Sequence, residues 1–371
     1  MEGIGNSIML TTDPQLAPIE KKLDGGQRLT AEDASALFRS PDLLGIGRLA
    51  ARDKARRAGA QVTYVVNRQI NPTNICIHSC AFCNFSSKEG RPEAYVLTEP
   101  EILARLSPEL KEVHIVGALY AGWSFEDYLD VIRVVKRRLP SVQVKAYTAV
   151  EVDFFASREK SSVRDILIRL KEAGVVCLPG GGAEIFSERV RKALFPSKIG
   201  WPVWSEVHRR AHGLGLRSNA TMLYGHIETP EERADHLLKL RTLQDETGGF
   251  LSFIPLAFQP GRSGIAARPT SVVDDLKTIA ASRLVLDNFD HIKAYWVTAG
   301  EDTCSMALRF GADDVDGTIG RELVMHAAGA LSPVGMARDR IEGLIRDAGF
   351  IPAERDALHN IVRPDPDLAV V

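Results

Sequence analysis

Short apolar segments alternate with amphipathic helical segments from about residue 62 onward, and this alternation restricts the fold more than any other feature. Eight apolar runs of strand length, each ended by a turn or a polar cluster, lie between predicted helices. They cover residues 63–75, 111–117, 142–149, 174–179, 216–223, 250–258, 292–298 and 313–319. Eight strands alternating with helices over about 260 residues are typical of a (β/α)8 barrel of the TIM type. A doubly wound open sheet is the competing architecture.

Helical segments flank the predicted barrel. Residues 1–60 are polar, have helical spacing and carry no strand pattern, and residues 331–371 contain one helical segment and a tail with Pro and Asp. We therefore expect a helical N-terminal extension over 1–60, a barrel core over 61–330 and a helical closing segment over 331–371. Capping boxes at 98–101 and 229–232 predict the starts of two of the intervening helices.

Charge and hydropathy exclude several classes of protein. Lys and Arg number 46 against 48 Asp and Glu, so the formal net charge of −2 offers no basic surface for nucleic acid. No apolar run reaches the roughly 18 residues that span a membrane. The N-terminus lacks the basic and then apolar pattern of a signal peptide. We expect a cytoplasmic protein that acts on a small molecule.

Three of the five cysteines stand within eight residues, at Cys76, Cys80 and Cys83. Thiolates are the usual ligands of iron–sulfur clusters, and three of them would leave one iron of a 4Fe–4S cluster open to a substrate. A structural zinc site takes four ligands, and no second pair lies nearby, since Cys177 and Cys304 are distant in sequence. A reducing compartment and a bound metal explain the odd number of cysteines better than a disulfide framework. The pattern predicts an iron–sulfur cluster.

The CxxxCxxC spacing after the first predicted strand, with Phe82 before the last cysteine, resembles the signature of the radical S-adenosylmethionine superfamily. This resemblance implies that Cys76, Cys80 and Cys83 hold a 4Fe–4S cluster whose open iron binds S-adenosylmethionine as a co-substrate. One electron, from a donor such as flavodoxin or ferredoxin, would then break the sulfonium C–S bond and give a 5′-deoxyadenosyl radical.

Functional residues of barrel enzymes gather at the C-terminal ends of the strands, so glycines and polar residues there are the candidates for cofactor binding. Gly117 ends the second strand, where the superfamily contacts the amino group of the cofactor. The stretch from Gly225 to Glu228 resembles the segment that lines the adenine, although Glu228 can equally be only the residue before a helix cap. The residues assigned to cofactor binding are Phe82, Gly117, Glu151, Gly182, Gly225 and Glu228.

Four residues are candidates for contact with the reacting groups. Glu184 follows three glycines, which either bring the backbone close to a ligand or only form a tight turn, and its carboxylate could accept hydrogen bonds from a ribose diol. Asn219 and His226 are polar groups at an apolar strand end, where a lone histidine is as often structural. Arg283, like Arg262, could clamp a carboxylate, because guanidinium binds carboxylates in a bidentate manner.

Asp313, Asp314 and Asp316 follow the start of the last predicted strand. Three aspartates so close together could bind a metal ion. Beside Gly317 they are more typical of solvated turn residues.

Longer stretches resemble the radical enzymes of the futalosine route to menaquinone. The resemblance extends from about residue 67 to 356, and residues 217–222 and 254–258 are more similar to the aminofutalosine synthases than to the cyclic dehypoxanthine futalosine synthases. Residues 118–121 depart from the family pattern, because a second glycine and a Leu-His-Pro sequence are expected there.

This resemblance implies a transferase that forms a C–C bond to the adenosyl group. The radical would add to 3-[(1-carboxyvinyl)oxy]benzoate, the aryl group would migrate, and loss of one carboxylate would give 6-amino-6-deoxyfutalosine. The alternatives are the cyclising sister enzyme, which abstracts hydrogen from dehypoxanthine futalosine, and a related deazaflavin-cofactor synthase. A binding module that only senses iron or redox state is the non-enzymatic alternative.

Overall fold

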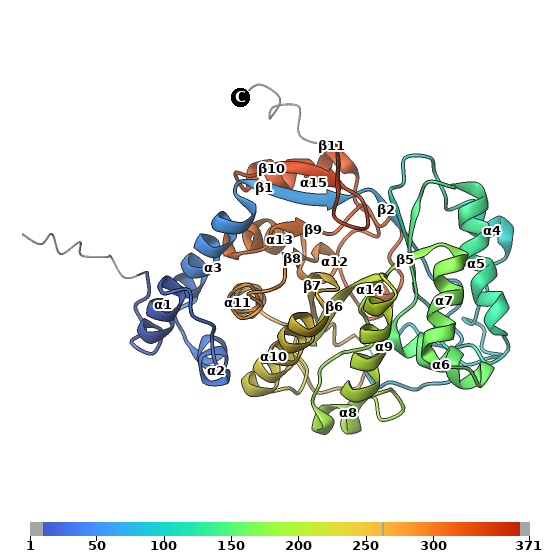
Figure 1. The fold of residues 1–371 in the computed structure, drawn as a ribbon, viewed down its shortest axis with the longest axis horizontal. Coiled ribbons are helices and arrows are strands. Elements are labelled where there is room, and N and C mark those ends of the chain that lie inside the picture. Colours follow the sequence, from blue (N-terminus) through green and yellow to red (C-terminus); the bar gives the residue numbers. More distant parts are fainter. Residues whose placement is uncertain (1–9, 262, 364–371) are drawn as a thin grey trace, which may run out of the picture.

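The computed structural model describes residues 10–261 and 263–363 and shows an α/β fold in which helices surround one curved sheet (Figure 1). The strands are β1 (Gln61–Val65), β2 (Asn67–Ile70), β3 (Glu112–Ile115), β4 (Gln143–Lys145), β5 (Val175–Leu178), β6 (Arg217–Tyr224), β7 (Phe250–Ala257), β8 (His291–Ala294), β9 (Asp314–Val315), β10 (Ile351–Arg355) and β11 (Ile361–Arg363).

Helices fill most of the connections between these strands. The helices are α1 (Ala17–Asp24), α2 (Ala31–Arg39), α3 (Leu43–Ala58), α4 (Glu99–Leu103), α5 (Phe125–Arg138), α6 (Ala149–Glu159), α7 (Val163–Ala173), α8 (Glu188–Leu194), α9 (Trp201–Gly213), α10 (Pro230–Thr247), α11 (Val272–Val285), α12 (Trp296–Ala299), α13 (Glu301–Ala307), α14 (Val324–Ala327) and α15 (Arg338–Asp347), with a 3-10 turn at Leu308–Phe310. The predicted capping boxes are confirmed at the starts of α4 and α10. None of the described helices is long and apolar enough to cross a bilayer.

Eight parallel strand positions form the barrel. Strands β2 to β9 lie next to one another in chain order, and each neighbouring pair is parallel. β1 and β2 are two halves of one extended segment, which pairs with β3 along one edge and with β9 along the other. The backbone N–H of Gln69 donates to Ile319 O at 2.9 Å, which continues the second edge beyond β9. The (β/α)8 prediction is therefore confirmed.

The N-terminal helices cover the outside of the barrel. α3 packs against α11, and α2 packs against α10 and α11. α2 begins at a capping box in which Thr30 and Asp33 satisfy each other's backbone N–H groups. These helices extend the barrel's outer layer and leave the C-terminal ends of the strands open.

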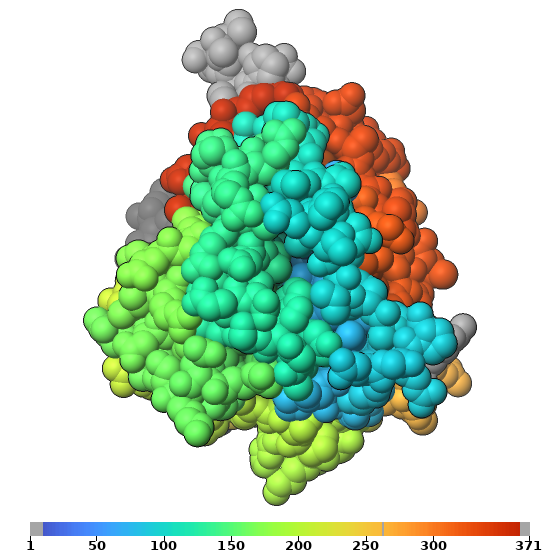
Figure 2. Space-filling model, turned by 90° about the vertical axis from the view of Figure 1, so that its right-hand side faces the viewer, coloured from blue at the N-terminus to red at the C-terminus, as the bar shows by residue number. Residues whose placement is uncertain are grey.

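The chain after the barrel contains the predicted helix, α15, but also two strands that we did not predict. β10 pairs in parallel with β1, and β11 pairs with β10 in the antiparallel direction. Pro352 argues against a strand because it lacks an N–H. Ile351 N donates to Ala60 O, and because backbone N–H groups alternate in direction along a strand, the nitrogen of Pro352 points away from β1. On that other side β11 pairs only with Glu354 and Arg355, so Pro352 needs no N–H there. Figure 2 shows the orange C-terminal segment beside the cyan segment that follows β2.

Charged side chains are buried within the sheet. Asp314 is fully buried and pairs with Arg355 at 2.7 Å and with Lys293 at 3.3 Å, while Glu112 pairs with Lys145 at 2.7 Å. Asp313 and Asp314 are therefore not solvated turn residues, and that prediction is wrong. Successive side chains of a strand point to opposite faces, so the two buried carboxylates meet different cations: Asp314 pairs with Lys293 and Arg355, and Asp313 pairs with Arg283.

Candidate active site

A cavity of about 260 Å³ opens at the C-terminal ends of the barrel strands. It lies where barrel enzymes place their functional residues. Of the residues predicted from the sequence, Cys76, Cys80, Phe82, Cys83, Gly117, Glu151, Gly182 and Glu184 line it. The structure thus brings the cysteine loop, the ends of several strands and the glycine-rich turn to one place.

Backbone hydrogen bonds fix the cysteine loop over the barrel. Ile77 N donates to Leu119 O at 3.0 Å, and Ala81 N donates to Leu194 O at 2.8 Å. Lys88 closes the loop from outside, because its ammonium donates to the carbonyl oxygens of Cys76 at 2.8 Å, Ile77 at 3.3 Å and His78 at 2.8 Å. The loop is therefore held at both sides, after β3 and at the end of α8.

The three cysteines are unpaired and half-buried on the cavity wall. Burial raises the pKa of the Cys80 thiol to about 11, and the nearby ammonium of Lys198 opposes this rise. Within residues 10–261 and 263–363, no three His, Cys, Asp or Glu side chains lie close enough to share one metal ion. A 4Fe–4S cluster is larger than a single ion, and three thiols facing one cavity beside a buried cation fit such a cluster.

The glycine-rich turn after β5 brings backbone close to backbone. Gly180 has φ +80°, and a Cβ there would lie 1.9 Å from Asn219 O, so no other residue fits. Glu184 follows with φ 45°, a rare left-handed conformation for a residue with a side chain. Its carboxylate forms a partly buried ion pair with Lys198.

Lys198 is a cavity residue that the sequence did not reveal. It stands between α8 and α9, and its ammonium lies 5.3 Å from the centre of the Phe82 ring. Burial alone would lower the pKa of Lys198, but Glu184 and the cysteine thiols together raise it above the ordinary value. A permanent positive charge therefore lies beside the cysteines. No periodicity or motif around residue 198 marks it in the sequence.

Glu151 has two roles in the structure. It is the third residue of α6, where its carboxylate accepts from Thr148 N at 2.7 Å and completes a capping box. It also accepts from Gly117 N at 3.1 Å and lines the cavity. Burial raises the pKa of Glu151 to about 7, although these hydrogen bonds oppose the rise. Glu151 and Gly117 are thus neighbours on one wall.

The predicted residues at the end of β6 do not line the cavity. Ser252 Oγ donates to Asn219 Oδ1 at 3.0 Å, deeper in the barrel. His226 Nε2 lies 3.0 Å from Leu223 O. Glu228 accepts from Gly225 N at 2.5 Å and forms an ion pair with Arg233 at 2.7 Å.

The pKa of Glu228 reflects these contacts within the turn. Burial would raise this pKa, but His226 and Arg233 hold it well below its usual range. Gly225, His226 and Glu228 therefore belong to the turn that leads into α10, which they stabilise, and not to the cavity wall.

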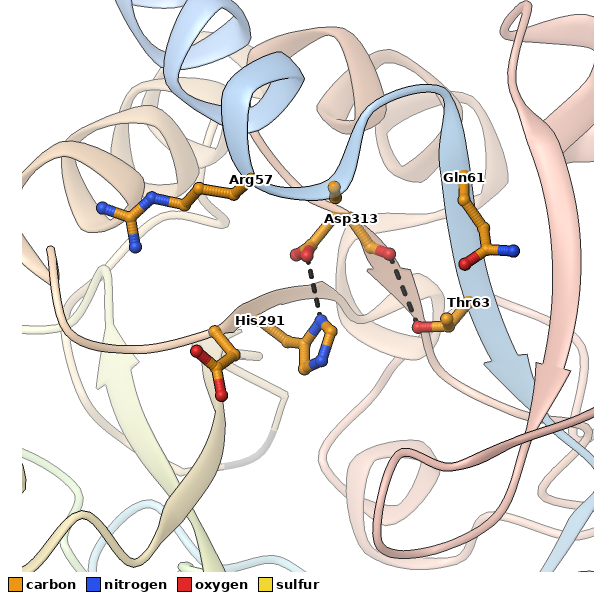
Figure 3. A pocket seen from close by; sticks show the side chains of 7 residues that line it. Arg57, Gln61, Thr63, His291 and Asp313 are labelled. Carbon is orange, nitrogen blue, oxygen red and sulfur yellow. Dashed lines mark hydrogen bonds and ion pairs between the residues drawn. The ribbon is translucent and has the colours of Figure 1, made fainter.

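Arg283 lies at the opposite end of the barrel. It forms a buried ion pair with Asp313, and its Nε donates to Gly311 O at 2.8 Å. Asp313 also lies 2.9 Å from Nδ1 of His291, and both line a separate hollow of about 530 Å³ (Figure 3). The buried partners of Arg283 fix it there, so it does not reach the cysteines. Arg262 lies outside the described residues.

Comparison with known proteins agrees with this site. The model of the Radical SAM superfamily matches residues 70–240, and that of the CofH/MqnC C-terminal region matches residues 247–367. The aminodeoxyfutalosine synthase of Thermus thermophilus is 44% identical over 95% of this chain and 97% of its own length. That of Streptomyces coelicolor is 42% identical over 94% of this chain and 95% of its own. The 5-amino-6-(D-ribitylamino)uracil–L-tyrosine 4-hydroxyphenyl transferase of Methanoculleus marisnigri is 38% identical over 94% of this chain and 98% of its own.

Solved structures support the fold. Methylornithine synthase (PylB) superposes with a TM-score of 0.72 at 19% identity, covering 90% of this chain and 96% of its own. The hydrogenase maturase HydG of Carboxydothermus hydrogenoformans gives a TM-score of 0.71 at 15% identity, covering 93% of this chain and 80% of its own. The 4Fe–4S cluster and S-adenosylmethionine are the cofactors of the superfamily, and the cysteine loop described here fits them. The chain belongs to the radical S-adenosylmethionine superfamily, within the group that contains the aminodeoxyfutalosine synthases.

Proposed function

We propose that this protein is an aminodeoxyfutalosine synthase of menaquinone biosynthesis. The observation that carries this proposal is the identity of 44% and 42% to two such synthases over nearly the whole chain. That span includes the cysteine loop and every segment that lines the cavity. The hydroxyphenyl transferases among the relatives are 34% to 38% identical.

The proposed reaction joins the adenosyl group to an aromatic acid. When bound, the 4Fe–4S cluster supplies the electron that splits the C–S bond of S-adenosylmethionine. The second substrate is 3-[(1-carboxyvinyl)oxy]benzoate, whose enol-ether double bond takes up the adenosyl carbon. Migration of the aryl group from oxygen to carbon and loss of one carboxylate, as CO₂ or bicarbonate with release of one electron, would give 6-amino-6-deoxyfutalosine.

The chain's own residues bind, orient and shield in this proposal. Cys76, Cys80 and Cys83 hold the cluster, and the ammonium of Lys198 offers a fixed positive charge for a carboxylate in the cavity. Glu184 holds that ammonium in place. The cofactor-binding roles of Phe82, Gly117, Glu151 and Gly182 are supported by their places on the same cavity wall. We assign no ligand contact to the predicted residues that lie elsewhere, which are Asn219, Gly225, His226, Glu228 and Arg283.

Apolar side chains would protect a radical in the cavity. Val116, Leu119, Val150, Ile254 and Leu256 line it, and such walls exclude water once ligands fill the space. Exclusion of water also strengthens the electrostatic contacts made by Lys198.

One observation favours two further candidate functions. The C-terminal third of the chain matches the CofH/MqnC model, so the cyclising futalosine enzyme and the deazaflavin-cofactor synthases remain the alternatives. All three reactions begin with the same cleavage of S-adenosylmethionine, and only the second substrate separates them.

A substrate panel tests the proposal. The anaerobically reconstituted and reduced protein would be supplied with S-adenosylmethionine and, in separate reactions, the carboxyvinyloxybenzoate, dehypoxanthine futalosine, or tyrosine with the ribitylaminouracil. We expect an adenosyl adduct only with the first. A cyclised product or a hydroxyphenyl adduct in either of the other reactions would contradict the proposed function.

We further propose that the protein works in the cytoplasm with a flavodoxin or ferredoxin as its electron donor. The need for a single low-potential electron supports such a donor. We also keep the division into an extension over 1–60, a core over 61–330 and a closing segment over 331–371, to which β10 and β11 belong.

A further inference from the structure

Most polar side chains on the cavity wall have a partner within the protein. Thr148 and Glu151 bond to each other, Thr221 donates to Gly180 O, Glu184 pairs with Lys198, Asp316 pairs with Lys293, and Glu322 accepts from the backbone N–H groups of residues 324–326. Three side chains on the barrel strands or directly after them are exceptions. Gln69, His114 and Tyr295 line the cavity, and none of the three side chains has a hydrogen-bond partner among the described residues.

These three residues form one wall. Gln69 of β2 and His114 of β3 are register partners, so their side chains stand next to each other on the barrel interior. Tyr295 directly follows β8, which is separated from the β1–β2 segment only by β9. Glu184 and Lys198 come from the segment that follows β5, across the barrel. The cavity therefore has a charged wall and a second wall of unpaired polar groups.

The second wall is neutral. Burial lowers the pKa of His114 to about 4, so its imidazole carries one N–H donor and no charge at neutral pH. Burial also raises the pKa of the Tyr295 hydroxyl well above its ordinary value, which keeps its proton in place. The Gln69 amide adds a further donor. Nε2 of His114 is inaccessible to solvent and has no hydrogen-bond partner among the described residues.

We propose that Gln69, His114 and Tyr295 form the subsite that receives the ring carboxylate of the aromatic acid substrate. This inference rests on the proposed function, because it assigns one end of that substrate to one wall. A carboxylate is an acceptor with several lone pairs, so it can take hydrogen bonds from all three neutral donors. The acidic neighbours Asp316 and Glu322 already have partners, because Asp316 pairs with Lys293 and Glu322 accepts hydrogen bonds from three backbone N–H groups.

Tyr295→Phe is the decisive variant, because it removes one hydroxyl that has no hydrogen-bond partner in the described part of the chain. Tyr147→Phe is the matched control, since the Tyr147 hydroxyl donates to Tyr128 O at 2.9 Å outside the cavity. Both proteins would be assayed with the carboxyvinyloxybenzoate and with the same phenyl ether lacking the ring carboxylate.

We expect Tyr295→Phe to raise KM for the carboxylated substrate about ten-fold or more, the usual range for a hydrogen bond to a charged group. KM for the truncated ether and for S-adenosylmethionine should change less than about two-fold in the same variant. Tyr147→Phe should change none of the three by more than that. His114→Gln, which keeps a neutral donor, should fall between Tyr295→Phe and the unaltered protein.

Two results would overturn the subsite. Equal rises in KM for both ethers would show that Tyr295 does not sense the carboxylate, and a rise confined to S-adenosylmethionine would assign the wall to the adenosyl group. Equilibrium dialysis of the labelled aromatic acid measures its binding without turnover. If the unaltered protein binds the acid but forms no adduct, the proposed function fails while the dialysis result with Tyr295→Phe still decides the subsite.

Discussion

Lys198 and Glu184 form a partly buried ion pair on the cavity wall that also carries Cys76, Cys80 and Cys83. The side chains of the pair are only 16% and 12% exposed. Glu184 adopts a left-handed backbone conformation at the end of the glycine-rich turn. The turn after β5 thus positions a carboxylate, and the carboxylate positions the cation that faces the thiols.

Breaking this pair from one side should destabilise the protein more than removing both partners. Lys198→Met leaves a partly buried, uncompensated carboxylate, which costs about 1–3 kcal/mol. Lys198→Met combined with Glu184→Gln should recover at least about half of that loss. Urea unfolding of the four proteins of this cycle measures both values. A double variant whose loss of stability equals the sum of the two single losses would show that the two side chains are not coupled.

The three loop cysteines should differ sharply from the buried ones. Replacement of Cys80 by Ala should abolish both the absorbance near roughly 400 nm and the cleavage of S-adenosylmethionine, because it removes a cluster ligand. Cys304 is 1% exposed and its Sγ lies 3.7 Å from Ala294 O, so Cys304→Ala should cost only about 1 kcal/mol of stability and keep the cluster. Full cleavage activity in Cys80→Ala would refute the assignment of the cluster to this loop.

Lys88 should control how readily the cysteine loop takes up iron. Its ammonium bonds to three successive carbonyl oxygens, so Lys88→Met frees the loop, whereas Lys88→Arg keeps a donor. We expect Lys88→Met to bind less iron than the unaltered protein after reconstitution, with Lys88→Arg in between. Iron content per chain is the measurement, and the exposed Lys192 offers a control in Lys192→Met. Equal iron in Lys88→Met and Lys192→Met would mean that these bonds do not organise the loop.

Glu151 should make stability depend on pH in a defined direction. Burial raises its pKa from 4.5 to about 7, so between these values the unfolded chain releases the Glu151 proton first. The contribution of Glu151 to the free energy of unfolding is fully present below about pH 4.5. It is lost as the pH rises through 7, by up to about 3 kcal/mol. Glu151→Gln lacks this titration, so its stability relative to the unaltered protein should improve between about pH 5 and about pH 8. Urea unfolding before reconstitution measures this difference, and a constant difference would contradict the raised pKa.

The barrel and the cysteine loop were predictable because their signals are local. Eight apolar runs mark the strands, and three cysteines in one loop mark the cluster. β10 was missed because Pro352 argues against a strand. Only the folded structure shows that β1 has an edge with which β10 can pair.

The walls of the cavity were only partly predictable. Gly182 and Glu184 stood out as a glycine-rich strand end, and both line the cavity. His226 stood out as a polar group at an apolar strand end and Glu228 through the family resemblance, yet their side chains turn to the backbone of their own loop. Lys198 was missed because it lies in the connection between α8 and α9, and no local pattern shows that this connection returns to Glu184.

The most direct test of the account follows the adenosyl carbons. S-adenosylmethionine labelled in its ribose would be given to the reduced protein together with 3-[(1-carboxyvinyl)oxy]benzoate, and the products would be separated by mass. The account predicts that the label joins the aromatic ring in one product, with release of one carboxylate carbon. Label found only in 5′-deoxyadenosine, with the benzoate unchanged, would contradict the claim that this cavity performs adenosyl transfer.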